Sequence, residues 1–91
     1  MEQSFKSVFD AIADTPQQAL NMKLRAELMN QIIQQIEEHH WTQKEAAKQL
    51  GVTQPRISDL LRGKMSLFSL DTLVNMLAAM GKDIEIHIKA A

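Results

Sequence analysis

Residues 41–63 read WTQKEAAKQLGVTQPRISDLLRG, and this stretch contains two helix-start signals separated by one glycine. In the first signal, Thr42 and Glu45 have the spacing of a capping box, in which each side chain accepts a hydrogen bond from the backbone N–H of the other residue. Gly51 suits the left-handed position at which such a helix ends. We therefore expect one short helix to begin at Thr42 and to end at Gly51.

A second short helix should follow at once, with Thr53 as its cap and Pro55 in its first turn. Two helices joined so closely must cross at short range, and the alanines at 46–47 leave room for that crossing. Ile57 and Leu60 provide apolar contacts to the core. Two capped helices around a glycine also occur in other all-helical proteins, but these features together favour a helix-turn-helix.

Apolar residues also recur at three- and four-residue spacing outside this stretch. They predict a short amphipathic turn or two over residues 5–12, a long helix over 15–39 and a further helix over 69–81. The whole chain, residues 1–91, then reads as one small all-α domain. After the last helix, residues 83–89 alternate between apolar and polar side chains, which is the period of a half-buried β-strand.

The predicted strand carries Ile84, Ile86 and Ile88 on one face. A lone strand is only marginally stable in water, and no second strand is evident in the sequence. We therefore expect the strand to pair antiparallel with its copy in a second subunit. The resulting homodimer would hold two copies of the second short helix at a fixed spacing. The alternative is a strand that packs on the helices of its own chain.

The composition excludes several classes of function. The chain has no cysteine, so a disulfide framework and a thiolate metal site are ruled out. The adjacent His39 and His40 would point about 100° apart on a helix, so we expect no metal and no cofactor. No Ser-His-Asp motif, glycine-rich phosphate loop or paired-carboxylate signature is present, which argues against an enzyme. No apolar run is long enough for a signal peptide or a membrane span, and we expect a cytoplasmic protein with no membrane partner.

The formal net charge of −1 hides a local imbalance. Residues 1–41 carry six acidic and three basic side chains, whereas residues 42–64 carry five basic and two acidic ones. Positive charge concentrated over the predicted helix-turn-helix points to a polyanionic partner such as double-stranded operator DNA.

Four polar residues near the start of the second short helix have the reach and the hydrogen-bonding groups to read base edges in a major groove. They are Gln54, Arg56, Ser58 and Asp59. In this prediction Arg56 pairs with guanine and Gln54 with adenine, while a competing prediction makes Arg56 a surface partner of Asp59. Residues at the helix starts and in the loop after the second helix are expected to grip phosphates. They are Gln43, Lys44, Thr53, Arg62 and Lys64.

The segment TQKEAAKQLGVTQPRISDLLRG, residues 42–63, resembles the helix-turn-helix of lambda-repressor-like regulators of the XRE and Cro type. A longer pattern runs from VFDAIADTPQQALNMKLRAEL through LFSLDTLVNMLAAMGKDIEIHI, within residues 8–89. It is similar to the HigA-type antitoxins of bacterial toxin–antitoxin operons. The resemblance implies a five-helix, lambda-repressor-like DNA-binding domain that acts as a dimer and often represses its own operon.

Residue by residue, the resemblance matches Gln43 to a phosphate contact at the start of the first short helix. It matches Gln54 and Arg56 to base-reading positions, and Asp59 to a further position that faces the groove. Pro55 departs from the polar residue that is more usual at its site. This departure removes a hydrogen-bond donor and leaves fewer base contacts to assign.

The resemblance thus implies a transcriptional repressor that is also the antitoxin of a HigB/HigA-type operon. Two other functions stay open at this point: a stand-alone XRE-family repressor without a toxin, and a protein-interaction module that mainly neutralises a toxin. The acidic N-terminal half would suit a small basic toxin. Its candidate contacts are Asp10, Asp14, Glu37 and Glu38.

Overall fold

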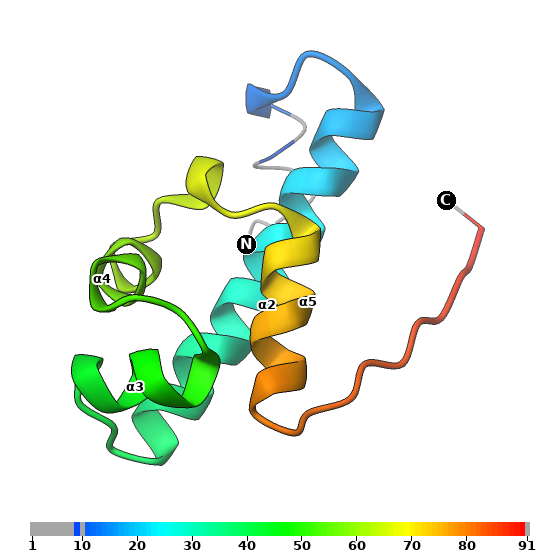
Figure 1. Cartoon of the computed structure of the whole chain (residues 1–91). Helices are drawn as coiled ribbons and strands as arrows, with labels where there is room; N and C mark the ends of the chain where they lie inside the picture. Colours follow the sequence, from blue (N-terminus) through cyan, green and yellow to red (C-terminus); the bar gives the residue numbers. More distant parts are fainter. Residues whose placement is uncertain (1–8, 10, 91) are drawn as a thin grey trace.

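The computed structural model describes residue 9 and residues 11–90. Within these residues the chain forms four α-helices and one short 3-10 helix (Figure 1). In chain order they are α2 (Pro16–Glu38), α3 (Gln43–Leu50), α4 (Gln54–Leu61), η1 (Met65–Leu67) and α5 (Leu70–Ala79). The predicted all-α fold is confirmed, and α2 and α5 lie side by side with α3 and α4 packed across them.

The sequence predicts a short amphipathic turn or two over residues 5–12, and the five-helix count depends on this segment. Of these, the structure describes Phe9, Ala11 and Ile12, whose backbone is helical. The other residues of that prediction lie outside the described part of the chain. Phe9 is buried and packs with Ala19 and Ala26 of α2 in a small apolar cluster separate from the main core.

The capping box predicted at the start of α3 is present. The Thr42 hydroxyl accepts a hydrogen bond from the Glu45 backbone N–H at 3.1 Å, and the Glu45 carboxylate accepts one from the Thr42 N–H at 2.8 Å. α3 ends at Gly51, whose φ of 69° is in the left-handed region. A residue with a side chain is strained in that region, which explains the glycine.

The expected cap of Thr53 on α4 is only partly right. Thr53 is the N-cap residue of α4, but its side chain makes no capping hydrogen bond. Pro55, at the second helical position, has no N–H to offer. The N–H of Arg56 instead donates to the backbone carbonyl of Thr53 at 3.1 Å. The helix thus begins without a hydroxyl cap, and the fixed φ of Pro55 suits its first turn.

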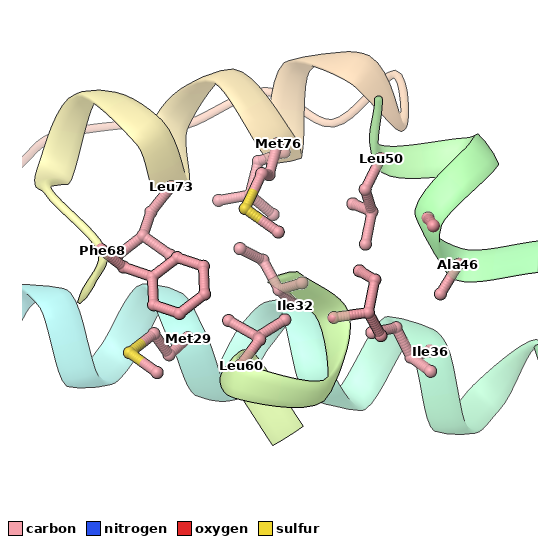
Figure 2. Packing of buried hydrophobic residues seen from close by; sticks show 12 residues of the cluster. Met29, Ile32, Ile36, Ala46, Leu50, Leu60, Phe68, Leu73 and Met76 are labelled. Atoms are coloured by element: carbon pink, nitrogen blue, oxygen red, sulfur yellow. The ribbon is translucent and has the colours of Figure 1, made fainter. Parts of the chain in front are cut away.

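One hydrophobic core holds α2, α3, α4 and α5 together (Figure 2). Ala46 is fully buried, so a small residue lies where α3 meets the other helices, as predicted. Ile57 and Leu60 are also fully buried and attach α4 to this core. Phe68, only 1% exposed, extends the core to the junction between η1 and α5.

The single chain forms no strand over residues 83–89, and the predicted strand, which would pair with a second chain, stays a prediction. The chain has no strand within residue 9 and residues 11–90. Ile84 packs against the core, whereas Ile86 and Ile88 are 77% and 89% exposed. Figure 1 shows this tail standing clear of the helices after α5. A strand needs a hydrogen-bonded neighbour, and the described chain offers the tail none.

Candidate nucleic-acid interface

The outer surface of α4 is the candidate surface for reading DNA. Residues four positions apart lie on the same side of a helix, so Gln54 and Ser58 lie together, to one side of the buried Ile57 and Leu60. Gln54 is exposed and Ser58 is half-buried. Neither side chain has a hydrogen-bond partner within the described chain. Their amide and hydroxyl groups are therefore free to meet base edges.

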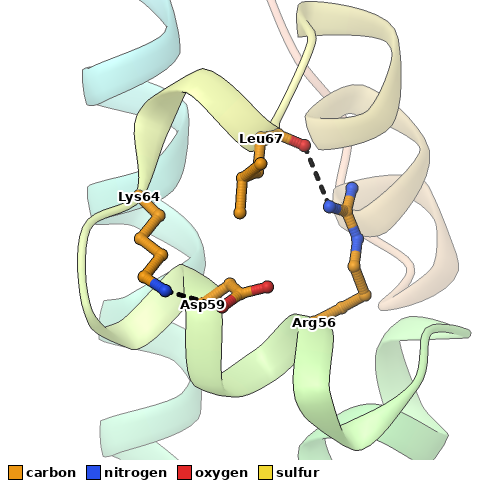
Figure 3. Close-up of polar contacts among 4 residues, drawn as sticks. All are labelled: Arg56, Asp59, Lys64 and Leu67. Atoms are coloured by element: carbon orange, nitrogen blue, oxygen red, sulfur yellow. Dashed lines mark hydrogen bonds and ion pairs between the residues drawn. The ribbon is translucent and has the colours of Figure 1, made fainter.

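Arg56 lies on a different flank of α4, which faces η1 (Figure 3). Its Nη1 donates a hydrogen bond to the backbone carbonyl of Leu67 at 2.9 Å. Its guanidinium carbon lies 4.3 Å from the centre of the Phe68 ring, which is the geometry of a cation–π contact. Neither alternative considered from the sequence included this contact. The guanidinium is therefore held by partners within the chain. Base reading by Arg56 stays a prediction.

Asp59 shares the flank of Arg56 but pairs with another residue. Its carboxylate lies 3.5 Å from the Lys64 ammonium, and the side chains are 26% and 47% exposed respectively (Figure 3). A pair this exposed contributes little to stability. It nonetheless places the ammonium beside the C-terminal half of α4 and offsets part of its charge. Base reading by Asp59 and phosphate binding by Lys64 stay predictions.

The other residues predicted to grip phosphates lie at exposed positions. Gln43 and Lys44 occupy the first turn of α3, and Thr53 immediately precedes α4. Arg62 follows α4, and its guanidinium has no hydrogen bond or ion pair within the described chain. These groups lie at the starts of α3 and α4 and just beyond the end of α4. Their phosphate contacts stay predictions.

Arg25 of α2 belongs to this region, and the sequence reasoning missed it. Its Nη1 donates to the backbone carbonyl of Met65 at 3.2 Å, and its Nε is buried without a partner in the described chain. The two residues are 40 positions apart, so no local pattern links them. A signal was nevertheless present, because Arg25 lies beside Ala26 and one turn before Met29, on the apolar side of α2.

The electrostatics of the α3 start are set by its capping box. The backbone N–H of Thr42, and then its side chain, bind the Glu45 carboxylate and hold the pKa of this group below its usual value. Glu45 therefore stays ionised near neutral pH. Its negative charge at a helix N-terminus is favourable for the helix dipole.

The comparison with protein families agrees with this geometry. The model of a family described as helix-turn-helix domain matches residues 11–89, nearly the whole chain. None of the curated proteins compared with the chain matches it. Along the described residues, no helix is both long and apolar enough to cross a membrane. The matched range extends past α5 and includes most of the tail. The family indicates a sequence-specific DNA-binding regulator, and the chain belongs to this helix-turn-helix family, of the XRE and lambda-repressor kind.

Proposed function

We propose that this protein is a sequence-specific repressor that binds the operator of its own operon as a homodimer. The observation that carries the proposal is the outer face of α4, where Gln54 and Ser58 present unpartnered polar groups within a helix-turn-helix. Such a helix fits the major groove and reads base edges from its N-terminal part. The amide of Gln54 matches the N6 and N7 atoms of adenine.

Phosphate contacts would hold α4 in register on the duplex. Gln43 and Lys44 can approach one DNA strand from the first turn of α3, while Thr53 and Arg62 flank α4. Lys64 can add a further contact from the loop, at the cost of its weak pair with Asp59. Contacts of this kind set affinity and salt dependence without reading sequence.

The test compares Gln54→Ala with Gln34→Ala, which removes the same amide from an exposed position on α2. The operator is first selected from a random duplex library, and binding is then measured by fluorescence anisotropy against operator and scrambled DNA. We expect Gln54→Ala to weaken operator binding by about 1–3 kcal/mol per half-site and scrambled binding much less. Gln34→Ala should change neither. A Gln54→Ala protein that keeps the wild-type preference would contradict the proposal.

The homodimer is supported by apolar surface that the single chain leaves uncovered. Ile86 and Ile88 of the tail are mostly exposed, and Leu20, Leu24 and Val74 leave 57%, 40% and 41% of their surfaces exposed on α2 and α5. Antiparallel pairing of two tails would pair the backbone groups along one edge of each tail and gather their isoleucines on one shared face. In the alternative arrangement, these isoleucines pack on the α2–α5 surface of their own chain.

Light scattering tests the dimer at micromolar concentration. We expect the full chain to be dimeric and a chain ending at Lys82 to be monomeric. Ile86→Asp should also give a monomer, whereas Glu85→Ala, on the other face of the tail, should not. A truncated chain that stays dimeric would contradict pairing through the tail and would show that the dimer interface lies on another surface.

The same protein is further proposed to act as an antitoxin that binds a small basic toxin. The supporting observation is that Asp14, Glu37 and Glu38 are exposed, while Asp10 lies outside the described residues. Charge reversal at the two glutamates should weaken capture of the small basic protein encoded by the neighbouring gene and leave operator affinity nearly intact. If no neighbouring gene product binds the wild-type protein, the stand-alone repressor is the correct description.

A further inference from the structure

We propose that Arg56 is a positioning residue, which fixes the loop after α4 against the start of that helix instead of reading a base. The inference rests on the proposed DNA binding and narrows it. Gln54 and Ser58 then carry the base reading, and the operator has no guanine whose recognition depends on Arg56. The contacts of three side chains around η1 carry the argument.

The 3-10 helix η1 is held at both ends by arginines from different helices. Arg56 of α4 binds the carbonyl of Leu67 at 2.9 Å, and Arg25 of α2 binds the carbonyl of Met65 at 3.2 Å. These two carbonyls belong to the first and last residues of η1. The loop thus has its backbone tied to the recognition helix and to the longest helix of the core.

The stacking of Arg56 on Phe68, together with its hydrogen bond to Leu67, restricts the positions that the guanidinium can take. The cation lies over the face of Phe68, and this ring is 1% exposed at the centre of the junction between η1 and α5. A charged donor bonded to a carbonyl and stacked on a ring must lose both contacts before it can enter the groove. Gln54 loses no such contact when it binds.

The loop after α4 also carries Lys64, so a fixed loop fixes the position of this cation. The ammonium of Lys64 is 3.5 Å from Asp59, and the Lys64 backbone N–H donates to the Asp59 carbonyl at 3.1 Å. Together with Arg56 at the first turn, these contacts tie both ends of α4 to one loop. The spacing between the base-reading face and the loop cation is then set before DNA arrives, which reduces the ordering needed on binding.

The experiment compares Arg56→Met with Arg62→Met. Both variants replace an arginine near the interface with an unbranched apolar side chain, but Arg62 has no side-chain partner in the described chain. Hydrogen exchange is measured first, in the free protein, at the amides of Leu67 and Phe68. These amides donate to the carbonyls of Lys64 and Met65 within the loop. Arg56→Met should speed their exchange about tenfold, as loss of a charge-assisted hydrogen bond predicts, and Arg62→Met should not.

Operator binding is measured next against a set of duplexes in which each base pair is changed in turn. A positioning role predicts that Arg56→Met weakens binding by about tenfold on every duplex and leaves the profile of base preference unchanged in shape. A profile that loses discrimination at one G·C pair would show that Arg56 reads that base and would overturn the proposal. Unchanged exchange at Leu67 and Phe68 would overturn it too.

Two further results keep the outcomes separate. If neither wild type nor variant prefers any duplex, the proposed DNA binding fails, while hydrogen exchange still decides whether Arg56 fixes the loop. If Arg56→Met does not fold, Arg56→Lys takes its place, because it keeps the charge but lacks the planar group that stacks and binds the carbonyl together. Its amides should show faster exchange than those of the wild type, and wild-type exchange would contradict the proposal.

Discussion

Leu60 of α4 is fully buried, whereas Ile88 of the tail leaves 89% of its surface exposed. Both residues belong to segments with a clear apolar pattern, and the two segments differ in where their partners lie. The α3–α4 pair finds its partners within the chain, in the core shared with α2 and α5. The tail, residues 82–90, places only Ile84 against that core.

The difference shows what an apolar pattern does and does not specify. A pattern states which face of a segment must be buried, but it does not name the surface that buries it. For α4 the covering surface is present in the same chain. For the tail, the unpaired backbone and exposed isoleucines agree with the proposed pairing between two chains, where the covering surface would come from a second copy.

The largest expected difference is between side-chain truncations in the two segments. Leu60→Ala leaves a cavity in a closed core and should lower the free energy of unfolding by about 2–5 kcal/mol. Ile88→Ala removes an exposed side chain and should cost nearly nothing when protein concentration is too low for association. Urea denaturation followed by circular dichroism measures both. A substantial cost of Ile88→Ala under dilute conditions would show that the tail packs on its own chain.

A smaller effect should come from replacing the glycines that follow α3 and α5. Gly51 precedes α4, and Gly81 precedes the tail. Gly51 and Gly81 have φ of 69° and 78°, and an added Cβ meets no atom within 4 Å at either position. Alanine there is therefore strained only by its backbone, by about 1–2 kcal/mol. Gly51→Ala should show this full cost, because fixed helices lie on both sides. Gly81→Ala should cost less, since the chain beyond it can relax. Equal losses in thermal unfolding would mean that the tail is as firmly held as α4.

The sequence predicted the helix-turn-helix well because its signals are local. The capping box of Thr42 and Glu45, the left-handed Gly51 and the buried Ile57 each depend on residues within one or two turns. The contacts of the arginines depend on tertiary structure. Arg56 reaches a carbonyl 11 residues away, too far for any helical spacing rule. The prediction that it paired with Asp59 was wrong for that reason, because Asp59 meets Lys64 instead.

The tail exposed the opposite limit of sequence reasoning. Alternation over residues 83–89 predicts a strand with one apolar face, but a strand is defined by a neighbour that the sequence of one chain does not contain. The missing side-chain cap of Thr53 is a third case. There the residue type was suitable, but the N–H three positions later, that of Arg56, donates to the backbone carbonyl of Thr53 and not to its hydroxyl.

The two threonines that precede α3 and α4 test this account with a smaller effect. Thr42→Ala removes the hydroxyl that binds the Glu45 N–H, so it should lower the free energy of unfolding by about 1 kcal/mol. Thr53→Ala removes a hydroxyl without a capping bond and should cost at most a few tenths of that. Thermal unfolding monitored by circular dichroism measures both. A Thr53→Ala cost equal to that of Thr42→Ala would mean that the hydroxyl caps α4 in solution.

The smallest effect concerns the pH dependence of the α3 cap. The pKa of Glu45 is lowered in the folded chain from its usual value of 4.5, because the Thr42 N–H, and then the Thr42 side chain, bind the carboxylate. A lowered pKa contributes stability at pH values above the usual pKa, and this contribution is lost as the pH falls through the folded-state pKa.

Glu45→Gln keeps an acceptor for the Thr42 N–H but does not titrate. The difference in Tm between wild type and Glu45→Gln should therefore be constant near neutral pH and should shift against the wild type below pH 4.5. Glu27→Gln makes the same change of charge at an exposed position on α2, where the carboxylate has no ion pair in the described chain, and serves as the control. If the wild type shows no extra loss below pH 4.5 relative to Glu45→Gln, the capping box does not hold the carboxylate in solution, and the firm local structure of α3 would rest on its core contacts alone.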